Sequence, residues 1–189
     1  TVETGSLFDG EKPVVLAFVY FGCPVVCPFY LDQLTNTLRG VDYTIGEDFR
    51  VVVVSIDHTE GVTESSGAKI RYTAAYGRDA TTVNAGWSFL TGDEQSVRAL
   101  ADAAGWYYQS LPNGEYSHPA ALIMVSPEGT VSRYMYGFEL PTKQVKLGLM
   151  NEILGRSAFA PTVFGCQAPD TGNAEIIAHY GTEEQKARY

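Results

Sequence analysis

Two largely apolar runs place the strongest constraint on how this chain can fold. Residues 14–21 read VVLAFVYF and residues 49–56 read FRVVVVSI, and both are rich in β-branched and aromatic side chains. A strand with water on one face alternates between apolar and polar residues, whereas a strand covered on both faces is apolar almost throughout. The runs therefore predict central strands of a sheet that is covered on its two faces.

Helix signals alternate with strand signals along the chain. Leu31, Leu34 and Leu38 recur at helical spacing before Gly40, and Asp93 is a candidate helix cap. We predict strands at 14–21, 49–56, 87–90, 106–110, 120–125 and 131–136, and helices at 29–38, 68–76, 94–104 and 140–154. Ser-Pro-Glu-Gly between the last two strands is typical of an antiparallel hairpin. Parallel crossovers followed by one hairpin predict an α/β, thioredoxin-like fold, with a mixed central sheet and helices on both faces.

This pattern ends near Gly155, so we expect one domain over residues 1–156 and a C-terminal tail over residues 157–189. The tail begins as a loop and becomes polar and helix-prone from residue 174 onward. No apolar stretch is long enough to cross a bilayer. Because the chain starts at Thr1, close to its first strand, we expect that a signal peptide or a membrane anchor precedes it, and that it contacts a membrane only through such an anchor.

The charge balance excludes some classes of partner. Apolar residues make up 45% of the chain, which is enough for an ordinary core, and the formal net charge is −9. Nucleic acids and anionic lipids bind clusters of Lys and Arg, and the sequence contains no basic run. We therefore expect no nucleic-acid partner.

Cys23 and Cys27 are the residues with the clearest chemical meaning. They follow the first strand at the start of the first helix, at the edge of the sheet where open α/β proteins bind ligands. Residues i and i+4 share a helix face, with Cα atoms about 6 Å apart, so the sulfurs can form a disulfide or hold one metal ion. A helix N-terminus favours thiolates, so we expect both pKa values to fall below about 8.5. Two soft sulfurs favour Cu(I) or Zn(II).

The histidines and the third cysteine carry weaker signals. His118 precedes the apolar run 120–125, and it can face the cysteine helix if that run pairs with the first strand. It would then complete a site of two thiolates and one imidazole; a capping or surface histidine is the alternative. His58, at the end of the second strand, is a candidate fourth ligand or outer-shell donor, with a solvated loop residue as the alternative. His179 lies in the tail. Cys166 has no partner in an odd count of three and is a free thiol or an intermolecular one.

Five segments, in this order, resemble the bacterial Sco/SenC family. They are VVLAFVYFGCPVVC (14–27), VVVSID (52–57), WSFLTGD (87–93), VRALADAAG (97–105) and SPEGTVSRYMYG (126–137). The resemblance covers roughly residues 5–155. The Cys-Pro-x-x-Cys-Pro motif becomes specific in combination with the downstream histidine and the hairpin. Where many relatives have proline after Ile-Asp, this chain has His58, and Pro119 directly follows His118.

The resemblance implies a thioredoxin-like copper chaperone. Family members bind copper, Cu(I) or Cu(II), through the two motif cysteines and a downstream histidine, which here are Cys23, Cys27 and His118. It implies delivery of copper to the dinuclear copper site of cytochrome c oxidase, or maintenance of the thiols of that site. The expected partner is the oxidase subunit with the copper site, or another copper chaperone. It also implies an extracytoplasmic location, in the bacterial periplasm rather than the mitochondrial intermembrane space, with a membrane tether.

Other functions stay open at this point. The main alternative is a thiol–disulfide oxidoreductase, in which Cys23 and Cys27 form a redox-active catalytic pair without obligatory metal. A peroxiredoxin-like peroxidase needs Thr or Ser three residues before its cysteine, but Tyr20 and Pro24 occupy these positions. A copper or redox sensor that binds a partner without turnover is the fourth reading.

Overall fold

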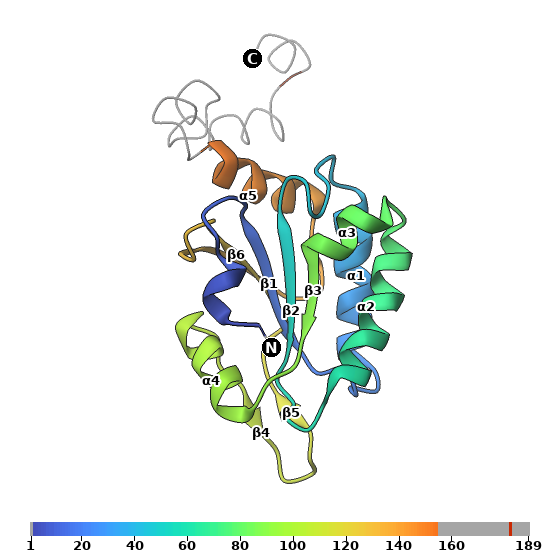
Figure 1. Ribbon diagram of the computed structural model, residues 1–189, viewed down its shortest axis with the longest axis vertical. Coiled ribbons are helices and arrows are strands. Elements are labelled where there is room, and N and C mark those ends of the chain that lie inside the picture. Colours follow the sequence, from blue (N-terminus) through green and yellow to red (C-terminus); the bar gives the residue numbers. More distant parts are fainter. Residues whose placement is uncertain (1, 155–181, 183–189) are drawn as a thin grey trace. The chain divides into compact units, whose positions relative to one another are not determined.

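The protein has a central five-stranded sheet with helices on both faces (Figure 1). The computed structural model describes residues 2–154 and residue 182. The strands follow the order β3-β2-β1-β6-β7, in which β1, β2 and β3 are parallel and β6 and β7 are antiparallel to their neighbours. This architecture confirms the predicted thioredoxin-like α/β fold with a mixed sheet and a terminal hairpin.

The bounds of the elements are as follows. The strands are β1 Val14–Val19, β2 Arg50–Ser55, β3 Trp87–Leu90, β4 Gln109–Ser110, β5 Tyr116–Ser117, β6 Ala121–Val125 and β7 Val131–Tyr136. The helices are a 3-10 turn at Thr4–Leu7, α1 Val26–Arg39, α2 Val62–Tyr76, α3 Ala80–Gly86, α4 Glu94–Ala103 and α5 Thr142–Leu154. β4 and β5 form a separate two-stranded ladder.

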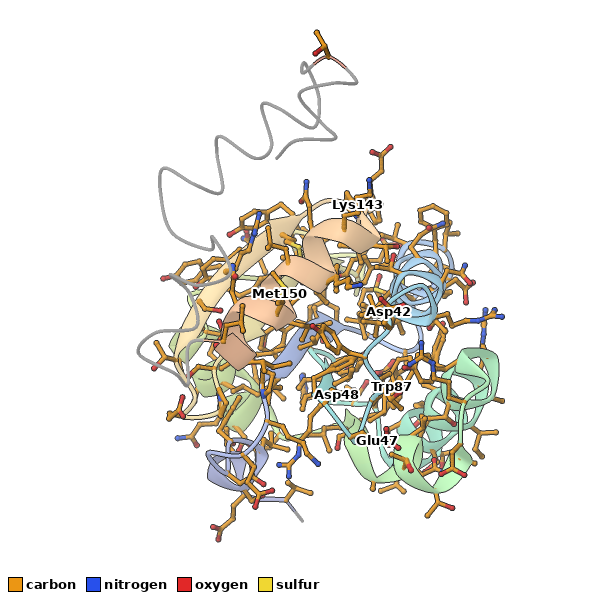
Figure 2. All side chains as sticks on the ribbon, turned by 90° about the horizontal axis from the view of Figure 1, so that it is seen from above. Asp42, Glu47, Asp48, Trp87, Lys143 and Met150 are labelled. Atoms are coloured by element: carbon orange, nitrogen blue, oxygen red, sulfur yellow. The ribbon has the colours of Figure 1, made fainter. Side chains whose placement is uncertain are left out.

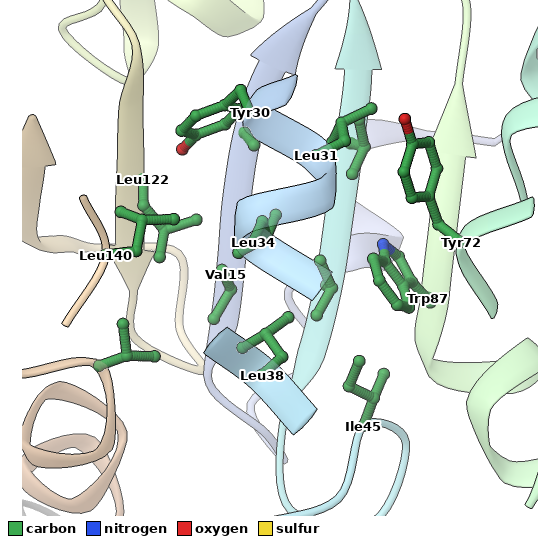
Figure 3. Close-up of a cluster of buried hydrophobic side chains, with 14 of the residues drawn as sticks. Val15, Tyr30, Leu31, Leu34, Leu38, Ile45, Tyr72, Trp87, Leu122 and Leu140 are labelled. Carbon is green, nitrogen blue, oxygen red and sulfur yellow. The ribbon is translucent and has the colours of Figure 1, made fainter. Parts of the chain in front are cut away.

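The apolar strands are buried on both faces because two cores flank the sheet. Alternate residues of β1 point to opposite sides. Val15, Ala17 and Val19 belong to the core under α1 and α2, and Val14, Leu16 and Phe18 belong to the core that includes α4. Figure 3 shows the leucines of α1 packed over the sheet, and Leu34 and Leu38 have no exposed surface. Burying such a leucine contributes about 1.5–3 kcal/mol.

Of two helices with predicted starts, α2 begins at a different residue and α4 begins where expected. The helix α2 was expected at 68–76 but begins at Val62, because the Glu64 side chain accepts a hydrogen bond from the Gly61 N–H at 2.8 Å and caps the first turn. The helix α4 begins at Glu94, and the side chain of Asp93 accepts from the Ser96 N–H as expected for its cap.

Two further expectations were wrong between residues 77 and 110. The sequence reading missed α3, which begins where the Asp79 carboxylate accepts from the Thr82 N–H. The predicted strand 106–110 is reduced to Gln109–Ser110. Trp106 instead stacks on Phe18 with ring centroids 4.7 Å apart, so burial of the indole takes precedence over strand pairing.

The sheet presents two different edges to the surrounding loops. Residues 20–25 leave β1 at the carboxyl-terminal edge of the parallel strands, and residues 40–49 return from α1 to β2 at the amino-terminal edge. Figure 2 labels Asp42, Glu47 and Asp48 on this second loop.

Contacts group residues 1–149 into one unit, which holds the whole sheet. The domain boundary at residue 156 stays a prediction, and no helix in the described part is long and apolar enough to span a membrane.

Candidate functional site

The two cysteines lie at the junction between β1 and α1, as expected, but they do not share a helix. The helix α1 begins at Val26, so Cys27 is in its first turn, and Cys23 and Pro24 precede it. The Sγ atom of Cys23 lies 3.3 Å from the Cys27 N–H and accepts its hydrogen bond. The N-cap residue is Val25, and its side chain makes no capping hydrogen bond. A sulfur outside the helix therefore serves as acceptor for one of the free N–H groups of the first turn.

His118 reaches the cysteines from a distant part of the chain. It lies between β5 and β6, and β6 pairs antiparallel with β1, which is the pairing on which the sequence prediction depended. Its Nε2 atom is 3.8 Å from Cys27 Sγ. A thiolate about 2.3 Å and an imidazole about 2.0 Å from one tetrahedral ion lie about 3.5 Å apart. The observed separation therefore fits two groups that hold a single ion between them.

The contact of the second ring nitrogen, Nδ1, determines which nitrogen of His118 carries the proton. Nδ1 lies 3.3 Å from the carbonyl oxygen of Pro119, which can only accept a hydrogen bond, so Nδ1 carries the proton. Burial lowers the pKa of His118, and the hydrogen bond to Pro119 opposes that shift. In the neutral ring the lone pair of Nε2 then faces Cys27, which is the arrangement of a histidine ready to bind a soft metal.

The two thiols differ in acidity, which corrects the expectation that both pKa values fall. Burial opposes ionisation of Cys23, but hydrogen bonds from the Cys27 N–H, the Tyr20 hydroxyl and the Val25 N–H outweigh it and lower its pKa below the ordinary 9.0. Burial raises the pKa of Cys27 to about 12, and the negative charges of Cys23 and Glu60 add to this rise. A bound cation would favour the thiolate of Cys27 by direct attraction.

Glu60, which the sequence analysis did not single out, binds residues 20–25, which we call the cysteine loop. Its carboxylate accepts hydrogen bonds from the backbone N–H groups of Phe21, at 2.9 Å, and Gly22. The hydroxyl of Ser55, at the end of β2, donates to the same carboxylate at 2.5 Å. The loop before Cys23 is thereby tied to the neighbouring strand. An acidic residue shortly after the second strand, at the same sheet edge, was the signal available in the sequence.

Aromatic rings surround the histidine, and the sequence analysis also missed them. The ring centroids of Trp106 and Tyr20 lie 5.5 Å and 6.2 Å from that of His118. Tyr20 in turn packs on Tyr116, at 5.4 Å. These rings restrict the orientation of the imidazole and cover part of its surface.

Other residues considered from the sequence do not join this cluster. His58 is exposed, and no hydrogen bond or ring contact in the described part ties it to Cys23, Cys27 or His118. Cys166 and His179 lie outside the described residues. Among residues 2–154 and 182, no three His, Cys, Asp or Glu groups form a preassembled metal cage.

Two cavities open on either side of the cysteine loop. The first, the His118 cavity, has a volume of about 480 Å³ and is lined by Cys23, His118 and Glu115 among others. The second, the α2 cavity, measures about 300 Å³ and lies against Cys27, Gly67 and Arg71. Each sulfur therefore adjoins a different cavity, with Tyr20 lining both.

Comparison with known proteins agrees with this fold and identifies a family. The sequence profile of the SCO1/SenC family matches residues 3–149. The crystal structure of Arabidopsis thaliana ScoI with copper bound is 20% identical, with a TM-score of 0.60 over 79% of this chain and 87% of that one. BsSco, described as a member of the Sco family of cytochrome c oxidase assembly proteins with a disulfide switch, is 19% identical, with a TM-score of 0.61 over 80% of this chain and 84% of that one. At these identities the likeness concerns the fold.

A curated relative of a different kind matches a shorter stretch. Acyl-CoA dehydrogenase family member 11 of Mus musculus is 37% identical over 96 residues, which make up 48% of this chain. The match spans only 12% of the length of that dehydrogenase.

Proposed function

The chain belongs to the SCO1/SenC family, and we propose that it is a metallochaperone that carries copper as its cargo between Cys23, Cys27 and His118. The observation that carries this proposal is the 3.8 Å separation of Cys27 Sγ and His118 Nε2, with Cys23 Sγ beside the Cys27 N–H. Two sulfurs and an imidazole suit Cu(I), and Cu(II) suits the same set with one further donor. Copper-bound ScoI from Arabidopsis thaliana has the same fold, which supports this choice of metal.

The partner that we propose is the subunit of cytochrome c oxidase with the dinuclear copper site, or another copper chaperone. The description of BsSco as a member of a family of oxidase assembly proteins supports this choice. Transfer would proceed by ligand exchange, in which ligands of the acceptor replace the three groups of the chain one at a time. Because Cu(I) prefers soft thiolates, the neutral imidazole would be the first group to exchange.

Copper loading tests the proposed ligands. Wild type, Cys23→Ser, Cys27→Ser and His118→Ala are loaded with Cu(I) without oxygen, desalted and assayed for copper by elemental analysis. We expect bound copper in the wild type. Each variant should retain much less copper, because loss of one ligand lowers the affinity at least about tenfold. His58→Ala is the matched control and should bind like the wild type. Equal copper in all five proteins would contradict the proposal.

Tryptophan fluorescence gives a second readout. Trp106 lies beside His118, whereas Trp87 lies in the core among Tyr76 and Phe89. Copper at the proposed site should therefore quench the emission of Trp106. The quenching should persist in Trp87→Phe and disappear in Trp106→Phe. Quenching that survives in Trp106→Phe would place the copper elsewhere.

A second function is favoured by the unequal thiols: reduction of disulfides in a partner. The Cys23 thiolate would attack one sulfur of the partner disulfide and release the other as a thiolate. Cys27 would then lose its proton, attack Cys23 and release the second partner sulfur, so that two electrons pass to the partner and the pair becomes a disulfide. A cellular dithiol reductant would return the pair to thiols. BsSco, with its disulfide switch, supports such a cycle.

The pH dependence of alkylation tests this second function. Because the pKa of Cys23 is lowered and that of Cys27 raised to about 12, the Cys23 thiolate forms at lower pH. Brief treatment with iodoacetamide near neutral pH, followed by peptide mass spectrometry, should modify Cys23 more than about tenfold faster. Equal rates would remove the basis for distinct roles. Reductase activity retained by His118→Ala would favour disulfide chemistry over copper carriage.

We further propose an extracytoplasmic location, in a bacterial periplasm, with a membrane tether outside this chain. Family membership supports this location, since the proposed acceptor presents its copper site outside the cytoplasm. Intact cells that express the full-length protein should show labelling of Cys23 by a membrane-impermeant maleimide that passes the outer membrane. Labelling only after lysis of the inner membrane would contradict the proposal.

A further inference from the structure

Exposed apolar side chains gather around the cysteine loop. Val25, Val26 and Phe29 are 69%, 47% and 50% exposed, and Leu111 and Phe138 are 37% and 40% exposed. We call these five residues the apolar rim. Val25, Val26, Leu111 and Phe138 line the His118 cavity, and the rings of Phe29 and Phe138 lie 5.8 Å apart. They come from three separate segments of the chain, so the rim is a product of the fold.

The candidate copper ligands lie below this rim. Cys23 is 6% exposed and Cys27 is 2% exposed, although Cys23 and His118 line a cavity with a volume of about 480 Å³. An acceptor must bring its own ligands to within about 2.3 Å of the ion during exchange. A flat surface that rests on the rim would not reach this depth. The acceptor therefore needs a protruding segment that enters the cavity.

The negative charge around the His118 cavity favours a partner with a basic side chain. Apart from the candidate ligands and Tyr20 and Tyr116, Glu115 is the only ionisable residue that lines the His118 cavity in the described part. Asp57, which accepts a hydrogen bond from Tyr116 at 3.4 Å, adds a second negative charge nearby. The whole chain has a net charge of −9. A Lys or Arg beside the metal ligands of the acceptor would be attracted to this cavity.

We propose that the apolar rim is the docking surface for one kind of occupant: a protruding loop of a copper-accepting protein. This loop carries soft ligands of the Cys, Met or His type, has apolar flanks that cover the rim, and presents a basic side chain to Glu115. The inference rests on the proposed function, because it assumes that the cavity holds copper.

Transfer kinetics test this proposal. The Cu(I)-loaded chain is mixed, without oxygen, with the purified copper-free soluble domain that carries the dinuclear copper site of cytochrome c oxidase. It is mixed separately with a water-soluble Cu(I) chelator. The V25S/F29S variant should transfer copper to the domain at least about tenfold more slowly, because the apolar anchors of an interface dominate its binding. Its transfer to the chelator should match the wild type.

The matched control is V62S/I70S, which removes two apolar side chains of α2 that are 77% and 71% exposed and lie outside the rim. It should transfer copper to the domain at the wild-type rate. Glu115→Lys should slow transfer to the domain and reduce its dependence on salt, without an effect on the chelator. A second rim variant, Leu111→Ser, should slow transfer in the same direction as V25S/F29S.

The outcomes separate the two proposals. A wild-type chain that holds no copper overturns the proposed function and this inference with it. A chain that holds copper overturns only this inference if V25S/F29S matches the wild type with the domain, or if its transfer to the chelator falls equally. Transfer from the wild type to the chelator but not to the domain also overturns the docking proposal.

Discussion

At the amino-terminal edge of the parallel strands, Val41, Ile45 and Trp87 are at most 1% exposed, whereas Val25 and Phe29 at the carboxyl-terminal edge are 69% and 50% exposed. Both edges are made of loops that join the same strands to the same helices. The amino edge buries its apolar side chains inside the protein. The carboxyl edge leaves them around the His118 cavity, in the place that we propose for a partner.

Polar contacts differ between the edges in the same way. At the amino edge, Arg78 donates to the carbonyl oxygens of Arg39, Val41 and Tyr43, so that loop is held by many internal bonds. At the carboxyl edge, Glu60 holds only the residues before Cys23, and His118 meets Cys27 at 3.8 Å. One edge therefore contributes stability, and the other leaves reactive groups beside two cavities. This separation explains how a well-packed sheet can present a pair of free thiols.

The largest effect should come from Gly86→Ala, which tests the close packing of the amino edge. A Cβ atom at Gly86 would fall inside van der Waals contact with the backbone of Gly46, and backbone cannot turn aside as a side chain can. We expect a loss of about 3 kcal/mol in the free energy of unfolding. Urea titration followed by circular dichroism measures it. A loss below about 1 kcal/mol would show that this edge can relax.

Arg78→Ala should have the next largest effect. The guanidinium is half-buried and donates four hydrogen bonds, three to main-chain carbonyls and one to Thr44 Oγ1, which would lose their partner. We expect a loss of about 2 kcal/mol in unfolding free energy. Arg71→Ala, which removes an exposed pair with Asp32 beside the α2 cavity, is the matched control and should cost less than about 0.5 kcal/mol. Equal losses would erase the contrast between the edges.

Glu60→Gln tests the polar contact that ties the loop before Cys23 to β2 at the carboxyl edge. Glutamine has a single acceptor oxygen, and its NH₂ group would face a backbone N–H of Phe21 or Gly22, so part of the clamp is lost. We expect a loss of about 1.5 kcal/mol in unfolding free energy, together with faster alkylation of Cys23. Glu47→Gln, an exposed acidic residue of the amino-edge loop, should change neither. Unchanged alkylation in Glu60→Gln would mean that the loop holds its shape without the carboxylate.

The fold could be predicted from the sequence where burial alone decides the structure. The runs at 14–21 and 49–56 gave β1 and β2 because both faces of these strands are covered. Prediction was wrong where a local hydrogen bond or a distant contact determines the bounds of a helix or strand. Capping by Glu64 extended α2 over a polar segment, and the stacking of Trp106 on Phe18 shortened a strand.

The candidate site could be predicted in part for a similar reason. The spacing of Cys23 and Cys27 and the resemblance to a family identified both thiols and His118 as candidate ligands. In the structure, His118 lies beside Cys27. Their unequal pKa values depend on burial and on donors from Tyr20 and Val25, which become neighbours only in the folded chain. The contact of Glu60 with the loop spans 39 residues, and an acidic residue after a strand does not by itself indicate this partner.

The smallest effect, and the only stabilising one, should come from Gly67→Ala in α2. Gly67 lies on the α2 cavity, and a Cβ atom there would meet nothing within 4 Å. Alanine inside a helix is favoured over glycine by about 0.5–1 kcal/mol, because the unfolded chain loses conformational freedom. Urea titration should show a gain of that size, opposite in sign to Gly86→Ala. The same methyl group would thus stabilise the protein at the open edge and destabilise it at the packed edge. A loss at both positions would show that the α2 cavity closes around Gly67 in solution, and the carboxyl edge would then be packed like the amino edge.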